Sequence, residues 1–128
     1  MTSTLAYDSR LTHQVIGLAI TVHRTLGPGL LESIYEECLS YELDQANLPY
    51  DRQRQLPVVY RDSRLEAAFR ADIIVASDLL LEIKSVEHLL PLHEAQILTY
   101  LRLSGCHVGL LMNFNSVTLK EGLRRFVR

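Results

Sequence analysis

Acidic, basic and amide side chains occur in three short stretches at spacings that suit metal-assisted chemistry on a phosphodiester. The stretches are Ala71-Asp72, Glu82-Ile83-Lys84, and Gln96 with Tyr100 four residues later. Carboxylate oxygens are the ligands that Mg²⁺ prefers, and an ammonium group near the metal stabilises negative charge that develops on a phosphate. These residue types therefore predict a site for hydrolysis of a phosphate ester.

The first two stretches flank a polar break that predicts a β-hairpin. The break at 76–78 separates two apolar runs of strand-forming residues. Folding the hairpin about its middle residue places Asp72 opposite Glu82 and Arg70 opposite Lys84. Like charges that face each other destabilise a strand pair, and a bound cation would convert this repulsion into chelation. A two-residue loop or a bulge would shift the register by one residue.

The second stretch distributes its groups between the two sides of a strand. Glu82 and Lys84 share one side because they are two residues apart, and Ile83 points to the core with its backbone carbonyl available as a further metal ligand. Lys84 would orient a metal-bound water or neutralise the transition state. The alternative is a surface Glu–Lys pair. The apolar neighbours favour a buried strand, where charges are rare unless they pair or bind a metal.

Other polar residues are weaker candidates when taken alone. Gln96 and Tyr100 lie one helical turn apart and could both reach a phosphate, or could simply face solvent. Glu32 opens a predicted helix, where the helix dipole favours a carboxylate as a cap. The five histidines show no metal-ligand spacing that cysteine supports. We expect helix capping or core packing for His23 and His93.

Length and composition predict one domain of ordinary globular type. The chain has 128 residues, of which 48% are apolar and 22% charged, and this is enough for a sizeable core. No apolar run approaches ~18 residues, so we expect no transmembrane helix. Residues 1–10 lack a signal pattern, and the predicted location is the cytoplasm. Cys38 and Cys106 suggest two buried thiols rather than a disulfide.

Charge is unevenly distributed along a chain whose net charge is −2. Residues 32–51 hold six acids and no Lys or Arg, whereas residues 52–70 hold five arginines, including Arg70, and residues 119–128 are also basic. The two basic segments could form a phosphate-binding rim or could be scattered solvated side chains. The net negative charge counts against strong non-specific binding of nucleic acid.

The elements are predicted in the order α-α-β-β-β-α-β, after a loosely ordered N-terminal tail at 1–9. Helices are expected at about 10–25, 31–46 and 91–105, and strands at 56–60, 65–75, 79–84 and 108–114, with 119–127 ambiguous between helix and strand. Pro57 places the first strand at a sheet edge. This order predicts an α/β fold with helices on both faces of a mixed sheet, in which an antiparallel meander is joined by one parallel strand.

Several of these segments resemble the GxxExxY protein family. The segments are Val22-His23-Arg24-Thr25-Leu26-Gly27-Pro28-Gly29-Leu30, Gly29 to Tyr35, Phe69 to Asp72, Glu82 to Val86, His93 to Gln96, and Asn113 to Asn115. The resemblance spans about residues 10–127. That family is part of the PD-(D/E)XK nuclease-like superfamily, whose restriction-endonuclease-like core has the order α-β-β-β-α-β. The predicted order agrees with it.

The resemblance implies roles for the candidate residues. By position, the metal ligands would be Glu32, Asp72, Glu82 and the Ile83 carbonyl; the catalytic set would add Lys84, Gln96 and Tyr100; and the substrate-binding set would be Arg70, Lys84, Gln96 and Tyr100. Gln96 and Tyr100 resemble the Gln-x-x-x-Tyr element of RecB-type nucleases. Ala71 stands where the superfamily's name has proline, a common departure.

Two functions remain open at this stage. The resemblance implies a nuclease that uses Mg²⁺ or Mn²⁺ to hydrolyse DNA or RNA, and it also suggests a homodimer because small domains of this superfamily often dimerise. The alternative is a non-catalytic module that binds nucleic acid or protein and retains the nuclease fold. The net negative charge and the acidic segment 32–51 motivate that alternative.

Overall fold

The chain begins with two helices that are joined by a glycine-rich turn. The computed structural model describes residues 2–128, in which α1 spans Thr2–Leu26 and α2 spans Glu32–Gln45. Gly27 and Gly29 have φ angles of 74° and 94°, a region that glycine enters without a steric penalty. The turn therefore depends on these two glycines, and it determines where α2 and Glu32 begin.

The rest of the chain forms one five-stranded sheet in the order β1-β2-β3-β4-β5. The strands are β1 (Tyr50–Tyr60), β2 (Ser63–Val75), β3 (Leu79–Lys84), β4 (Val108–Asn113) and β5 (Leu123–Val127). The β3–β4 pair is parallel and the other pairs are antiparallel. Helix α3 (Pro91–Ser104) makes the crossover that a parallel pair requires, and the short helix η1 (Leu119–Gly122) precedes β5.

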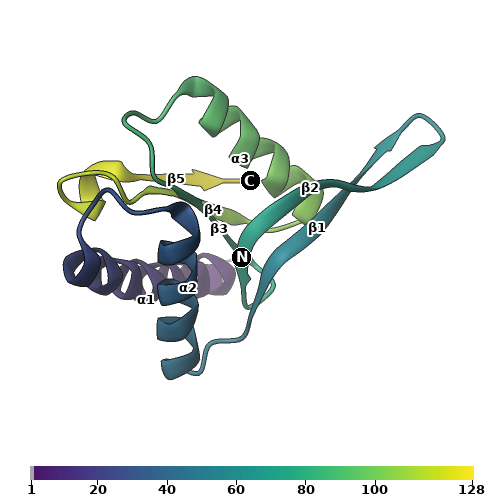
Figure 1. Ribbon diagram of the computed structural model, residues 1–128. Helices are drawn as coiled ribbons and strands as arrows, with labels where there is room; N and C mark the ends of the chain where they lie inside the picture. Colours follow the sequence, from purple (N-terminus) through teal and green to yellow (C-terminus); the bar gives the residue numbers. More distant parts are fainter. Residues whose placement is uncertain (1) are drawn as a thin grey trace.

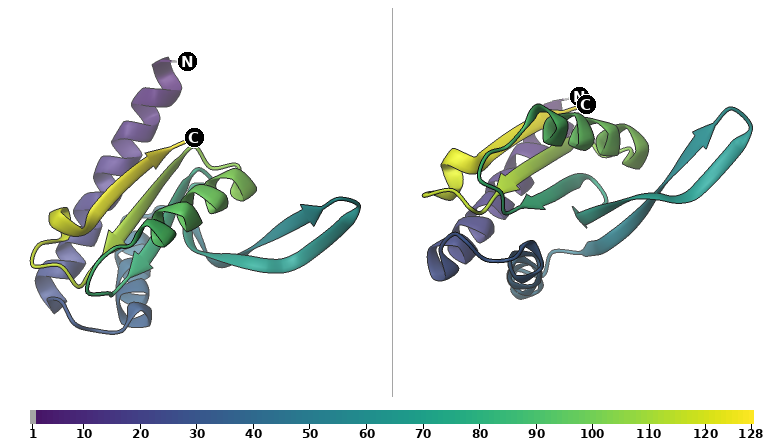
Figure 2. Two further views of the ribbon diagram at one scale, coloured as in Figure 1. Left: turned by 90° about the horizontal axis from the view of Figure 1, so that it is seen from above. Right: turned by 45° about the horizontal axis from the view of Figure 1, so that its top comes forward.

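The helices cover both faces of the sheet, α1 and α2 on one side and α3 on the other (Figures 1 and 2). Strand β3 contributes to both cores. Leu79, Leu81 and Ile83 pack in the cluster that contains α1 and α2, whereas Leu80 packs in the cluster that contains α3. Because side chains alternate along a strand, Glu82 and Lys84 lie on the α3 side.

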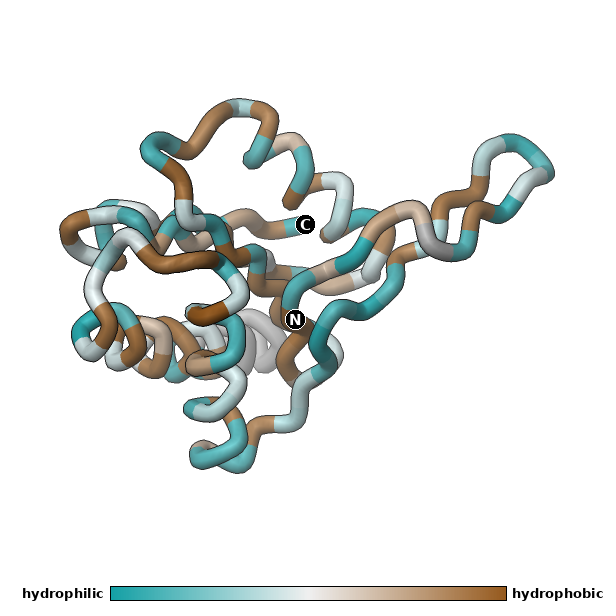
Figure 3. Tube along the Cα trace, in the orientation of Figure 1, coloured by the Kyte–Doolittle hydropathy of each residue, from teal (hydrophilic) through white to brown (hydrophobic). Residues whose placement is uncertain are grey.

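Strands β1 and β2 extend beyond the body of the sheet as a two-stranded arm (Figures 1 and 2). Their ladder continues to the pair Tyr60↔Ser63, with an irregularity next to Pro57, whereas β3 pairs only with Ile73–Val75 of β2. Hydrophobic stretches continue along both strands of the arm to a hydrophilic tip (Figure 3). Part of this apolar surface is exposed, and the side chain of Tyr60 is an example.

The predicted α/β fold is confirmed, and the differences lie at element ends. The first helix begins at Thr2 rather than near residue 10, because helical backbone continues beyond the apolar stripe that predicted it. Strand β1 begins at Tyr50 rather than near residue 56, because its first part is polar and mostly exposed and so shows no alternation. The ambiguous segment 119–127 forms both η1 and β5. Pro57 lies in an edge strand, as predicted.

Two further expectations concern the ends of the chain. The single-domain assignment and the loosely ordered tail at 1–9 stay predictions; Met1 lies outside the described residues. Among residues 2–128, no helix combines the length and the apolar character needed to cross a membrane.

Candidate active site

Strands β2 and β3 separate beyond the pair Ile73↔Leu81, and two carboxylates lie where they part. The Asp72 N–H donates to Glu82 Oε1 at 3.0 Å, and the Ile83 N–H donates to Asp72 Oδ2 at 2.8 Å. Backbone N–H groups that leave a ladder need other acceptors when they are buried. The side chains of Asp72 and Glu82 supply these acceptors. The predicted hairpin register is confirmed as far as the neighbouring pair, Ile73↔Leu81.

The ladder does not continue to Arg70 and Lys84, which the sequence placed opposite each other. Arg70 instead pairs with Gln55 of β1, and its side chain is exposed. The turn at the other end of the hairpin has Ala76 and Ser77 in left-handed conformations, with φ angles of 51° and 57°. A three-residue turn thus sets the register that brings the carboxylates together.

Burial and the charge of a neighbouring carboxylate raise the pKa of both carboxyl groups. Only 4% of Glu82 is exposed, and loss of hydration, followed by the nearby charge of Asp72, raises the pKa of Glu82 to about 8. Burial also raises the pKa of Asp72, as does the charge of Glu36, while the hydrogen bond from Ile83 opposes the change. Without a cation, Glu82 is therefore protonated at neutral pH.

Helix α3 brings the predicted amide and phenol to the same place. Lys84 Nζ donates to Gln96 Oε1 at 3.2 Å. Burial raises the pKa of Tyr100, as do the charges of Glu82 and Asp72, whereas its hydrogen bond with Gln96 lowers it. The ammonium of Lys84 acts in the opposite sense on the pKa of both carboxyl groups. The strand pair and α3 thus gather five of the six predicted catalytic residues around one point.

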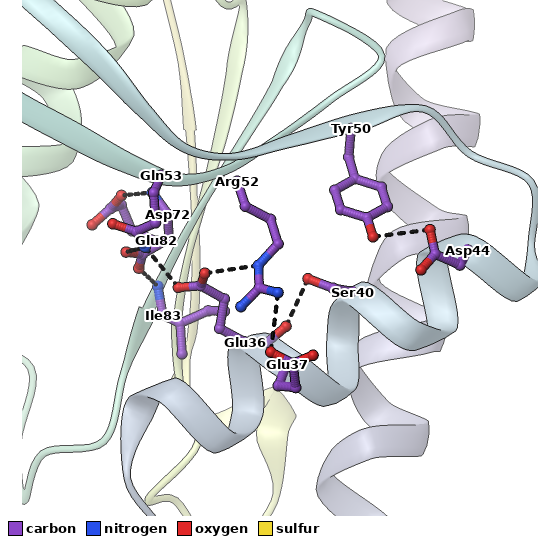
Figure 4. A network of polar contacts seen from close by, with 10 residues as sticks. All are labelled: Glu36, Glu37, Ser40, Asp44, Tyr50, Arg52, Gln53, Asp72, Glu82 and Ile83. Carbon is purple, nitrogen blue, oxygen red and sulfur yellow. Dashed lines mark hydrogen bonds and ion pairs between the residues drawn. The ribbon is translucent and has the colours of Figure 1, made fainter.

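The sixth residue, Glu32, lies on the α2 side of this point with a second carboxylate that sequence reasoning missed. Glu32 is exposed, and its Oε2 accepts from the Ser85 N–H at 3.3 Å. Glu36 is buried one turn further along α2 and is joined to Asp72 by Gln53, whose Nε2 lies 2.8 Å from Glu36 Oε1 and 3.3 Å from Asp72 Oδ1 (Figure 4). The spacing of four from Glu32 was the available signal, because it puts both acids on one helix face.

Glu36 is held by a cation as well as by the amide of Gln53. Arg52 Nε lies 3.0 Å from Glu36 Oε2, and Arg52 Nη1 lies 3.0 Å from Glu37 Oε1 (Figure 4). A buried carboxylate needs such partners to remain charged. Glu36 therefore links α2 to β1 and β2, and its charge acts on Asp72.

Two cavities adjoin the carboxylates. The acidic cavity has a volume of about 530 Å³ and is lined by residues that include Glu32, Glu36, Gln53, Asp72 and Ser85. The aromatic cavity, on the α3 side, has a volume of about 410 Å³ and is lined by residues that include Phe69, Lys84, Leu92, His93, Gln96 and Tyr100. Asp72 and Lys84 thus open to different cavities, although both act electrostatically on Glu82.

The oxygen donors at this point are of the type that a hard divalent cation prefers. Asp72 and Glu82 supply carboxylates, and the Ile83 carbonyl faces the parted strands because the N–H and C=O of a strand residue point to the same side. Over residues 2–128, however, no three His, Cys, Asp or Glu side chains are grouped so as to hold a metal ion. A cation at this point would therefore bind two carboxylates that also accept backbone hydrogen bonds.

The remaining motif residues support the positions of these groups. The Tyr35 hydroxyl donates to the Gly27 carbonyl at 2.6 Å and accepts from the Leu30 N–H at 3.0 Å, which fixes the turn before Glu32. Asn113 holds the segment after Lys84, since its side chain bonds both backbone groups of Val86.

The two histidines have the structural roles that were expected of them. His93 Nδ1 accepts from the Leu90 N–H at 3.0 Å, which caps α3. His23 is buried, with Nε2 2.9 Å from the Ser116 carbonyl oxygen.

Comparison with known proteins gave one finding that covers nearly the whole chain. A family model described as the PD-(D/E)XK nuclease superfamily matches residues 9–126. Comparisons with curated proteins and with solved structures gave no match. The narrower resemblance to the GxxExxY proteins stays a prediction.

Proposed function

The chain belongs to the PD-(D/E)XK nuclease superfamily, and from this we propose that it is a nuclease that hydrolyses a phosphodiester bond with a divalent cation at Asp72 and Glu82. One observation carries the proposal: a buried carboxylate, Glu82, and a half-buried one, Asp72, lie together where β2 and β3 separate, and the charge of Lys84 acts on both. Perturbed ionisable groups beside an open cavity are typical of catalytic sites.

In this proposal, Asp72 and Glu82 hold the cation together with the Ile83 carbonyl, and Glu32 approaches from the acidic cavity. When bound, Mg²⁺ or Mn²⁺ would offset charge on the scissile phosphate and lower the pKa of a water ligand. Glu82 must lose its proton to become a ligand. Because its pKa is about 8 without a cation, uptake of metal at neutral pH should release a proton.

Lys84 and the residues on α3 act on the substrate side. The Lys84 ammonium would neutralise charge on the phosphate or orient the attacking water. Its hydrogen bond to Gln96 restricts its position, so Gln96 has a positioning role. Tyr100 and Arg70 would contact the nucleic-acid substrate. Tyr100 would do so from α3, and Arg70 from the exposed side of β2.

The test is hydrolysis of labelled single- and double-stranded DNA and RNA in Mg²⁺, Mn²⁺ or EDTA. We expect wild-type protein to cleave at least one substrate with metal only, and Glu82→Ala and Lys84→Ala each to reduce the rate by ~100-fold or more. Glu87→Ala and Arg102→Ala remove charges of the same sign from exposed positions and should retain wild-type rates. A wild-type protein that cleaves nothing on the panel, or site variants that cleave at full rate, would contradict the proposal.

One observation favours the alternative, a non-catalytic binding module. Asp72 and Glu82 accept backbone hydrogen bonds, and the part of the chain described holds no three-residue cluster for a metal. Such a module would recover a defined nucleic acid or protein equally well with wild-type and Lys84→Ala baits. Equal recovery together with no hydrolysis would support the alternative over the nuclease.

A further inference from the structure

The aromatic cavity has walls that the chemistry proposed above does not use. Phe69 of β2 and Tyr100 of α3 form one wall, with ring centroids 5.5 Å apart and ring planes at 50°. Leu92, on the first turn of α3, also lines the cavity and is 74% exposed. Phe69 is 38% exposed although its ring contacts a nearly buried tyrosine. The cavity therefore presents an apolar and partly aromatic surface to solvent.

The same cavity includes the cation of the candidate active site. Lys84 and Gln96 line it, and their side chains are hydrogen-bonded to each other. A phosphate that contacts Lys84 would therefore have its own nucleoside, or a neighbouring one, beside the wall of Phe69. Ligand sites commonly combine apolar walls with a few polar groups that fix orientation.

Charge near this wall favours a polyanion. Lys84 lines the aromatic cavity, and no aspartate or glutamate is among the residues that line it. The acidic cavity, in contrast, is lined by two glutamates and an aspartate. A negatively charged strand is therefore favoured on the aromatic side.

We infer that the aromatic cavity holds an unpaired nucleobase, stacked on the exposed face of Phe69, while the adjoining phosphate lies at Lys84. The inference rests on the proposed function and names its substrate class as single-stranded nucleic acid. A base within a duplex is stacked on both faces and must be extruded before it can enter such a cavity, whereas a base in a single strand enters without that cost. Base–aromatic stacking tolerates any sequence.

The test measures binding of a fluorescein-labelled single strand that carries 2-aminopurine, with Ca²⁺ in place of Mg²⁺ to prevent hydrolysis. Wild-type protein should bind the single strand ~10-fold or more tightly than the matched duplex, and stacking should quench 2-aminopurine at one position of the strand. Phe69→Ala should weaken binding by roughly 10-fold and abolish the quenching. An abasic site at that position should weaken wild type to the same extent and leave Phe69→Ala unchanged.

Two variants separate stacking from other effects of the substitution. Phe69→Leu keeps an apolar side chain and should keep the melting temperature, yet it should lose the quenching. Tyr60→Ala removes an exposed aromatic ring from the end of β1, away from the residues that line the cavity, and should bind as wild type does. Equal affinities of Phe69→Ala and Tyr60→Ala, or duplex binding as tight as single-strand binding, would overturn the inference.

The outcome also separates this inference from the nuclease proposal. If wild type hydrolyses a substrate and Phe69→Ala binds the single strand as tightly as wild type does, the nuclease proposal stands and the base site is refuted. If quenching depends on Phe69 but no hydrolysis occurs in Mg²⁺ or Mn²⁺, the base site stands and the nuclease proposal is refuted. Absence of binding to every strand would overturn both.

Discussion

The two cavities that adjoin the carboxylates are built by different means. The acidic cavity is held by polar contacts between α2, β1 and β2, in which Arg52 and Gln53 bind Glu36. The aromatic cavity is held by packing of Phe69 on Tyr100, and Gln96 forms hydrogen bonds with Lys84 and with Tyr100. The comparison suggests that the two cavities have different roles. In the proposed function, the acidic side would set the charge around the cation, and the aromatic side would select the nucleic-acid strand that is bound.

The largest expected effect is that of a substitution at Asp72, which should impair metal-dependent hydrolysis and leave base stacking in the aromatic cavity intact. Asp72→Asn keeps an acceptor for the Ile83 N–H but removes the charge of a proposed metal ligand. We expect hydrolysis to fall by ~100-fold or more and Mn²⁺ binding, measured by calorimetry, to be lost. Quenching of 2-aminopurine in EDTA should persist, because Asp72 does not line the aromatic cavity. Loss of both metal binding and base stacking in this variant would refute the separate roles of the two cavities.

A smaller effect concerns stability of the metal-free protein as a function of pH. Between the ordinary glutamate pKa of 4.5 and about 8, Glu82 is protonated in the folded chain and ionised in the unfolded chain. The folded state then binds more protons, so the free energy of unfolding falls as pH rises through this window. We expect urea denaturation in EDTA to show a loss on the order of a few kcal/mol between pH 5 and pH 8.

Glu82→Gln is the variant that sharpens the pH prediction. It retains an acceptor for the Asp72 N–H but cannot ionise, so its unfolding free energy should vary much less over the same window. A slope equal to that of wild type would show that Glu82 is not the group responsible.

The smallest expected effect tests the polar construction of the acidic side. Arg52→Ala removes one of the two partners of the buried Glu36 carboxylate, which should cost about 1–3 kcal/mol in the free energy of unfolding. Arg64→Ala removes an arginine that pairs with Glu66 in the exposed arm, where ion pairs contribute about 0–1 kcal/mol. Equal effects in thermal or urea denaturation would mean that burial of Glu36 does not depend on Arg52.

Sequence patterns predicted the parts of the site that lie on regular elements. Alternation placed Glu82 and Lys84 on one side of β3, and the short polar break at 76–78 gave the register that brings Asp72 to Glu82. These inferences succeeded because the period of a strand is local and is fixed by burial on both faces.

The acidic cavity could be predicted only in part. Glu36 is oriented by Arg52 and Gln53, which follow it by 16 and 17 positions, and no local period reports such contacts. The predicted strand at 56–60 was shorter than β1 for a related reason. The first residues of β1 are held by pairing with β2 rather than by an apolar pattern, so a reading based on hydrophobic alternation passes over them.

The hydrogen bond between Glu32 and Ser85 joins positions that are 53 residues apart. Contacts of this range form late, because the loop they close must first lose much of its conformational freedom. A nascent chain cannot make this contact until Ser85 has left the ribosome, and it lacks Tyr100 for longer still. A chain that ends before α3 would therefore lack Gln96 and Tyr100, and one that ends before Ser85 would also lack the hydrogen-bond partner of Glu32.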